Sequence, residues 1–264
     1  MNAILAVIVL AACGVQSLRW LRVAQREHYL PSVGVFALRW WRSDNVNLAL
    51  AMTAVLATVG SLFRGLFVVL VAAIVSVSPL GLPLTGRTAR LAWTPRMRAT
   101  AAIAAVLVGP LVVGALATGF PALYSVTLLG FPWLVDLALR IWNPMQRRLD
   151  QRWVDQAKAG LDRSGARVVA ITGSYGKTTT KGYLAHLLAG QTTVTASPAS
   201  FNNRMGLARA VNEHLGGGTD GFIAEMGTYG AGEIRDLCSW IPPEVAVLTA
   251  LGPVHLERMT TLEA

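Results

Sequence analysis

Five stretches of the chain are apolar over enough residues to cross a lipid bilayer, which takes about 20 residues per helix. They cover residues 2–18, 46–63, 65–85, 100–119 and 121–141. Between them lie short turns or arginine-containing loops, and after Trp142 polar and apolar residues intermix. The pattern predicts an α-helical transmembrane region over residues 1–142, with about five spans.

The loops between these stretches differ in length and in charge. Arg64-Gly65 and Gly119-Phe120-Pro121 are very short breaks, and they predict tight helical hairpins whose turns lie on one side of the membrane. The other loops carry most of the arginines: Arg19, Arg22, Arg26, Arg39, Arg42, Arg87, Arg90, Arg96, Arg98, Arg140, Arg147 and Arg148. Positively charged loops stay in the cytosol. We therefore expect a multi-pass protein of the cell (inner) membrane, with its N-terminus outside and everything after Trp142 in the cytosol.

Asp136 is an acidic residue inside the fifth apolar stretch, and two interpretations are open. A carboxylate within a membrane span can be functional. Arg140, however, follows four residues later near the membrane edge, where an i,i+4 ion pair on a helix is ordinary. We favour the structural pair.

Residues 143–165 form a polar stretch with a narrow apolar stripe. After Asn143-Pro144, the apolar residues Met145, Leu149, Trp153 and Ala157 recur every four positions, the spacing of one helix face. The stretch predicts an amphipathic connecting helix, which lies along the membrane surface or packs on the next domain.

From residue 166 the pattern changes to short β-branched runs that alternate with helical segments. The predicted strands are residues 168–172, 192–195, 222–225 and 245–249. Strands separated by crossover helices predict a mainly parallel sheet that is covered on both faces. Residues 166–264 are therefore expected to form an α/β domain.

Composition agrees with this division. The chain is 53% hydrophobic and 14% charged, and its mean hydropathy of +0.49 is unusual for a soluble domain of this length. Residues 1–142 contain eleven arginines against three acids, whereas the remainder is nearly neutral. The basic excess flanks apolar segments, so we expect no nucleic-acid partner. The two cysteines are too few for a disulfide framework, and a reducing compartment suits the second half.

The strongest local motif follows the first predicted strand and runs from Gly173-Ser174-Tyr175-Gly176 into Lys177-Thr178-Thr179. Glycines let backbone amides approach phosphate oxygens, and a helix N-terminus adds partial positive charge. The lysine can reach the terminal phosphates and the first threonine can bind magnesium. The motif predicts a phosphate-binding loop (P-loop), although Ile171 stands where the general G-x-x-x-x-G-K-[ST] form has its first glycine.

The shortened loop resembles that of the Mur ligase family, and later segments extend the resemblance in the expected order. Those segments are Ser200-Phe201-Asn202-Asn203 with Gly206, Glu225-Met226-Gly227, residues 230–237, and Leu251-Gly252-Pro253-Val254-His255-Leu256-Glu257. They are similar to the branch of the family that adds D-alanyl-D-alanine. The resemblance covers about residues 166–264.

The resemblance implies two cofactors, ATP and Mg²⁺, and a role for each motif residue. Lys177 would contact the β- and γ-phosphates, Thr178 and Glu225 would hold magnesium, and His255 would help to bind a second magnesium ion. Glu225 also ends a predicted strand, where open α/β sheets place ligand-binding groups. The implied catalytic residues are Lys177, Glu225 and His255. The implied nucleotide pocket comprises Gly173, Ser174, Tyr175, Gly176, Lys177, Thr178, Thr179, Asn202 and Asn203.

The implied activity is ATP-dependent formation of an amide (peptide) bond through an acyl phosphate, in peptidoglycan or related cell-envelope synthesis at the cytosolic membrane face. The expected partners are ATP, membrane lipid, and carboxylate and amine substrates of cell-wall precursor type. The open alternatives are a membrane transporter, a signalling ATPase, and a catalytically inactive nucleotide-binding scaffold.

The chain departs from the family pattern in three places. Membrane spans stand where the family has a uridine-nucleotide-binding domain. Two interpretations are open: the chain acts on a lipid-linked or membrane-delivered precursor, or the spans only anchor the enzyme near the cell-wall machinery. Ala250 follows Thr249 where an asparagine is usual. The sequence stops at Ala264, so we expect a truncated domain that is not fully active alone.

Overall fold

A computed structural model describes residues 2–84, 91–199, 201–228 and 230–253. The chain divides into two compact units, Met1–Gln146 and Arg147–Ala264. The boundary falls inside one helix, α6 (Pro121–Ser164). Each unit has its own hydrophobic core.

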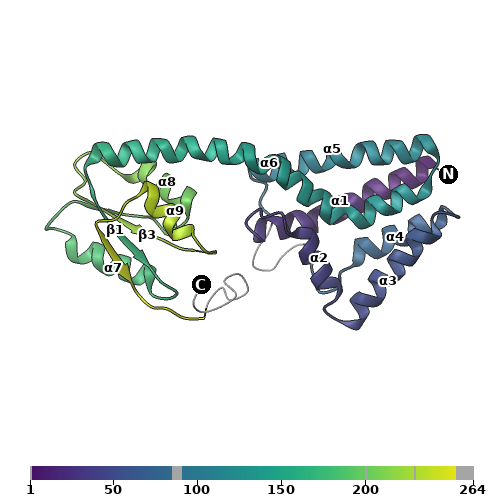
Figure 1. Cartoon of the computed structure of the whole chain (residues 1–264), viewed down its shortest axis with the longest axis horizontal. Coiled ribbons are helices and arrows are strands. Elements are labelled where there is room, and N and C mark those ends of the chain that lie inside the picture. Colours follow the sequence, from purple (N-terminus) through teal and green to yellow (C-terminus); the bar gives the residue numbers. More distant parts are fainter. Residues whose placement is uncertain (1, 85–90, 200, 229, 254–264) are drawn as a thin grey trace. The chain divides into compact units, whose positions relative to one another are not determined.

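The first unit is helical and consists of the start of α6 with five helices before it (Figure 1). These are α1 (Asn2–Arg26), α2 (Val33–Trp41), α3 (Asn45–Gly60), α4 (Leu66–Val77) and α5 (Pro95–Thr118). Helix α1 contacts α2, α4 and α5, and α3 forms a hairpin with α4. Trp20, Leu21, Tyr124 and Leu128 are fully buried in the core between these helices.

In the part of the chain that the structure describes, three helices, rather than the predicted five, are long and apolar enough to cross a membrane: α1, α5 and α6. The prediction is wrong for residues 46–63 and 65–85, where α3 has 16 residues and α4 has 12. At 1.5 Å per residue, α4 spans only about 18 Å of a hydrocarbon core about 30 Å thick. It ends at Val77 because Pro79 disfavours helical backbone at Ser78. Apolar length along the sequence therefore overstated the helical length.

The place of Arg19 between two apolar stretches had predicted a loop, but Arg19 does not lie in one. It belongs to α1, which extends to Arg26, and only 3% of it is exposed. Its guanidinium donates hydrogen bonds to five backbone carbonyls at and after the end of α4: Val75, Ser76, Val77, Ser78 and Leu82. The last carbonyls of a helix have no partner within it, and a buried Arg19 supplies one.

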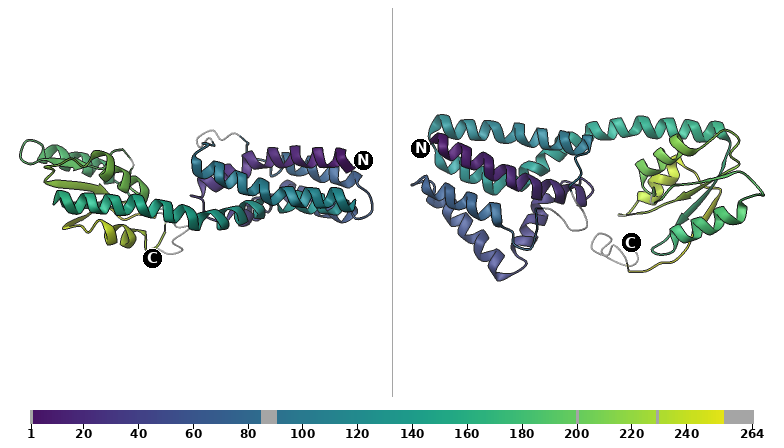
Figure 2. Two further views of the ribbon diagram at one scale, coloured as in Figure 1. Left: turned by 90° about the horizontal axis from the view of Figure 1, so that it is seen from above. Right: turned by 180° about the vertical axis from the view of Figure 1, so that it is seen from behind.

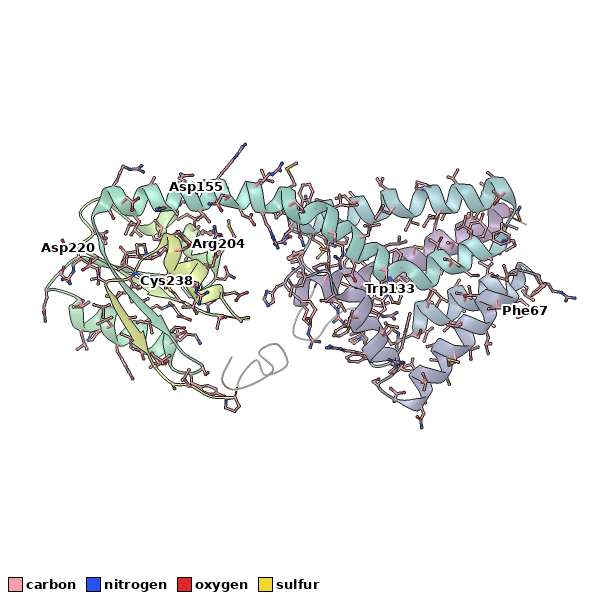
Figure 3. The ribbon with its side chains drawn as sticks, viewed as in Figure 1. Phe67, Trp133, Asp155, Arg204, Asp220 and Cys238 are labelled. Carbon is pink, nitrogen blue, oxygen red and sulfur yellow. The ribbon has the colours of Figure 1, made fainter. Side chains whose placement is uncertain are left out.

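Asp136 also has a partner that the sequence did not indicate. Its carboxylate accepts hydrogen bonds from the backbone N–H groups of Val33 at 2.8 Å and Gly34 at 2.9 Å, at the start of α2. None of the ion pairs of the described residues joins it to Arg140. Trp133, labelled in Figure 3, lies beside Gly34 so closely that a Cβ there would be 2.6 Å from its indole nitrogen. The favoured i,i+4 pair is therefore wrong, and Asp136 holds α2 against α6.

The connecting helix predicted for residues 143–165 is the second part of α6, not a separate element. Helix α6 runs through Pro144 without ending. Of the predicted apolar stripe only Ala157 is buried, and Val154 and Leu161 complete the face that packs into the second unit. A proline removes one hydrogen bond from a helix, but favourable packing on either side of it can maintain the helix.

The second unit is built on a parallel sheet, as predicted. Its strands are β1 (Arg167–Thr172), β2 (Val194–Ala196), β3 (Gly221–Glu225) and β4 (Val245–Leu248), in the spatial order β2-β3-β1-β4. Helix α7 (Lys177–Leu188) lies on one face. Helices α8 (Arg204–His214) and α9 (Glu233–Trp240), with the end of α6, share a core with the other face (Figure 2). The carboxyl ends of all four strands therefore meet at one edge of the sheet.

Candidate functional site

The candidate site lies where β1 and β3 end side by side. In the register of these parallel strands, Ile171 of β1 is opposite Glu225, the last residue of β3. The backbone N–H of Met226 donates to the Ile171 carbonyl at 2.8 Å and extends the pairing by one step. The turn from β1 into α7 therefore begins next to the Glu225 carboxylate.

The turn itself, residues 173–176, requires glycine at both ends. Gly173 has φ +137° and Gly176, which precedes the first residue of α7, has φ +82°. A Cβ on Gly173 would lie 2.3 Å from Thr249 Oγ1 and 2.9 Å from the Ala250 carbonyl oxygen. The close approach of residues 249–250 therefore excludes any side chain at position 173, whatever its chemistry.

Residues 249–252 form a wall along this turn, mainly through backbone groups. The Thr249 hydroxyl donates toward the carbonyls of Tyr175 at 2.6 Å and Thr172 at 3.1 Å. The Ser174 N–H donates to the Ala250 carbonyl at 2.6 Å, a contact that does not depend on the side chain at position 250. The Ser174 hydroxyl exchanges hydrogen bonds with the backbone of Gly252. These hydrogen bonds fix the conformation of the turn.

Lys177 and Thr178 open α7, and both side chains have partners within the site. The Lys177 ammonium donates to the carbonyl oxygen of Gly173 and so folds back over the turn. The Thr178 hydroxyl lies 3.1 Å from Glu225 Oε1 and 3.0 Å from Oε2. Thr179 is exposed, and the structure gives it no contact with this group of side chains.

Glu225 is the centre of the site and is 2% exposed. Besides Thr178, its carboxylate binds the Lys181 ammonium at 2.8 Å and the Asn202 side-chain nitrogen at 3.4 Å. Lys181 was not among the residues selected from the sequence. It lies four positions after Lys177, one turn further along α7, and this spacing was the available signal.

The two neighbouring asparagines have different places. Asn202 is half-buried, and its side-chain nitrogen faces Glu225. Its backbone carbonyl oxygen accepts the Gly227 N–H at 2.7 Å. Asn203 is exposed and caps α8, since its side-chain oxygen accepts the Gly206 N–H at 2.9 Å. The structure therefore brings Asn202, but not Asn203, to the carboxylate. His255 lies outside the described residues.

The donor set of the site suits a hard divalent cation that also binds phosphate. Thr178 and Glu225 supply oxygen atoms, the ligand type that magnesium prefers. Within the described ranges, no group of three or more His, Cys, Asp and Glu side chains could hold a metal by itself. Magnesium is usually bound by one or two carboxylates together with substrate phosphates and water. These residues therefore fit a magnesium ion that is shared with a nucleotide.

Comparison with known proteins places this site in a family context. Residues 171–264 match the Mur ligase middle domain, which confirms the resemblance found in the motifs. The chain is 37% identical over 107 residues to the UDP-N-acetylmuramoyl-tripeptide--D-alanyl-D-alanine ligase of Bacillus subtilis (strain 168), covering 40% of this chain and 23% of that protein. It is 38% identical over 109 residues to the enzyme of the same name from Mycobacterium tuberculosis (strain H37Rv), covering 40% and 20%.

A crystal structure of MurF from Acinetobacter baumannii is similar with a TM-score of 0.41 and 25% identity, over 43% of this chain and 25% of that one. The chain spans less than a quarter of the length of these two curated relatives. The matched part is the segment that contains the turn, Lys177, Thr178, Lys181 and Glu225.

Proposed function

We propose that this chain, whose residues 171–264 match the Mur ligase middle domain, supplies the ATP- and magnesium-binding part of a ligase. The proposed reaction activates a carboxylate as an acyl phosphate, which an amine then attacks to give an amide, ADP and phosphate. The observation that carries the proposal is the pair formed by Thr178 and Glu225, at hydrogen-bond distance beside the first turn of α7.

The turn and the start of α7 are suited to bind the phosphates. Backbone N–H groups at a helix N-terminus have no partner within the helix and carry partial positive charge. Lys177 donates to a carbonyl of its own turn, a contact that it can exchange for a phosphate oxygen. A strongly positive environment for the γ-phosphate is what phosphoryl transfer requires of the protein.

The oxygens of Thr178 and Glu225 would hold the magnesium ion, which neutralises charge on the phosphates when it is bound. The Asn202 side-chain nitrogen contacts Glu225 Oε1 and helps to orient the carboxylate. The role of His255 at a second magnesium ion stays a prediction.

The proposed substrates are a carboxylate and an amine of peptidoglycan-precursor type, by analogy with the names of the relatives. Ligation assays that compare soluble with lipid-linked acceptors test which form of the precursor is used.

We also propose that α1, α5 and the first part of α6 cross the cell membrane, with the nucleotide site in the cytosol. Contacts inside the first unit support a common orientation of the three helices. Near one end the Tyr124 hydroxyl bonds the Asn2 carbonyl. At the other, Asn143 bonds both Arg96 and the Tyr29 carbonyl. Near this second end of the three helices lie Arg26, Arg96, Arg98 and Arg140. Their positive charge favours the cytosolic side.

Native cysteines allow a test of this topology in intact cells. Cys13 is buried, whereas Cys238 is partly exposed in the second unit. A membrane-impermeant maleimide is expected to label Cys238 only after the cells are permeabilised, and Cys238→Ser is the control for specificity. Labelling of Cys238 in intact cells would refute the cytosolic placement.

Nucleotide binding is tested with the full chain purified in detergent. The affinity for ATP is measured with and without magnesium for wild type, for Lys177→Ala, and for Lys158→Ala, which removes an exposed lysine of α6. We expect magnesium-dependent binding that Lys177→Ala weakens by at least about tenfold and that Lys158→Ala leaves unchanged. Equal affinities for wild type and Lys177→Ala would refute the nucleotide site.

A further inference from the structure

Lys181 and Glu225 form a buried ion pair in the candidate site. The two residues are 6% and 2% exposed, and their charged atoms are 2.8 Å apart. The same ammonium donates to the Ala199 carbonyl at 2.8 Å, in the segment before α8 that also holds Asn202. Ala199 has φ +41°, a backbone conformation that a non-glycine residue keeps only when its surroundings hold it. Lys181 therefore joins α7, β3 and this segment.

The pairing places the Lys181 ammonium beside the proposed magnesium ligand. Glu225 Oε2 contacts both Lys181 and Thr178, whereas Oε1 contacts Thr178 and Asn202. A divalent cation entering without a counter-anion would meet the lysine charge within a poorly solvated site, where repulsion is strong. When the cation arrives bound to nucleotide phosphates, the negative charge of the phosphates offsets the positive charges of both the cation and the lysine.

We propose that Lys181 is a positioning residue that neutralises Glu225 in the nucleotide-free protein, so that magnesium binds only together with the nucleotide. The inference rests on the proposed function, because it assigns an order of binding to the same site. Lys181 also keeps the carboxylate directed at Thr178, because Glu225 Oε2 contacts both side chains.

The test is binding of Mn²⁺, a paramagnetic substitute for magnesium, to the full chain in detergent without nucleotide. Free Mn²⁺ is measured by electron paramagnetic resonance. Wild type is expected to bind Mn²⁺ weakly at this site. Lys181→Met, which keeps the length of the side chain but removes its charge, is expected to bind Mn²⁺ at least about tenfold more tightly. Lys181→Arg retains the charge and is expected to resemble wild type.

Three controls assign the binding to this site. Lys158→Met removes an exposed lysine and should change nothing. Adding Glu225→Gln to Lys181→Met should abolish the gained Mn²⁺ binding. In wild type, ATP is expected to increase the amount of protein-bound Mn²⁺ at least about tenfold, after the Mn²⁺ that ATP binds in solution without protein is subtracted, since metal and nucleotide then bind as one unit.

Equal Mn²⁺ affinity of wild type and Lys181→Met would overturn the inference while leaving the nucleotide site intact. Tight nucleotide-free binding by wild type that Glu225→Gln removes would also overturn it, and this result does not depend on how well Lys181→Met folds. Absence of ATP binding by wild type would overturn the proposed function together with the inference.

Discussion

Replacement of Gly173 by alanine tests the geometry of the turn between β1 and α7. Two effects act together. At φ +137° an L-residue is strained, which costs about 1–3 kcal/mol. The new Cβ would also lie 2.3 Å from Thr249 Oγ1, so the hydroxyl must move and give up its contacts with the Tyr175 and Thr172 carbonyls. A lost hydrogen bond of this kind costs about 1 kcal/mol.

The expected destabilisation of the second unit by Gly173→Ala is therefore about 2–4 kcal/mol. Gly182→Ala is the matched control, because Gly182 lies in α7 and a Cβ there meets no atom within 4 Å. That variant should stabilise the unit by up to about 1 kcal/mol, since alanine favours helix over glycine. The same change from glycine to alanine is thus expected to have opposite effects on stability at two positions nine residues apart.

The two variants are compared in thermal unfolding of the full chain, with trypsin cleavage of the second unit as the readout. At about 4 °C per kcal/mol for a domain of this size, Gly173→Ala should lower the midpoint by roughly 8–16 °C. Gly182→Ala should leave it unchanged or raise it by about 4 °C. A wild-type midpoint for Gly173→Ala would refute the close approach of residues 249–250 to the turn.

Three further predictions concern single contacts, each measured as the unfolding midpoint of its own unit. Asn203→Ala removes the N-cap of α8 and should lower the free energy of unfolding of the second unit by about 1 kcal/mol. The nucleotide affinity should not change, because the Asn203 side chain does not face Glu225. Asp220 (Figure 3) has a pKa below its usual range. The larger cause is the hydrogen bond that its carboxylate accepts from the Thr193 N–H, and the smaller one is the hydrogen bond from the Thr192 hydroxyl. The contribution of Asp220 to stability is therefore full above about pH 4 and lost as the pH falls through the lowered pKa, a dependence that Asp220→Asn should remove. Arg19→Met leaves the carbonyls after α4 without their buried donor and should destabilise the first unit by about 3 kcal/mol, whereas Arg26→Met, with a side chain 60% exposed, should have little effect.

The sequence by itself determined the local elements of the second unit. The four strands, their parallel arrangement and the glycine turn before Lys177 follow from short-range patterns of apolar residues and glycine. Such patterns are legible in a single sequence because the hydrogen bonds and side-chain periods of a strand or helix involve residues close together. The motif residues likewise indicated the family that residues 171–264 match.

Only the tertiary structure decided how distant residues pair. Glu225 is 44 residues from Lys181, and Asp136 is 103 from Val33. Local spacing had assigned Asp136 to Arg140, four residues away, but a carboxylate binds whichever donors the packing brings to it. The backbone N–H groups at the start of α2 are such donors, since they have no partner within their own helix.

The lengths of the helices were likewise decided by packing and by helix ends. Apolar composition alone extended α4 beyond Val77 and separated α6 at Pro144. In the folded chain α4 stops early and its last carbonyls bind Arg19, while α6 continues because Val154, Ala157 and Leu161 are buried in the second core. Hydrophobicity specifies which residues avoid water, but long-range contacts determine where a helix ends and which charges lie side by side.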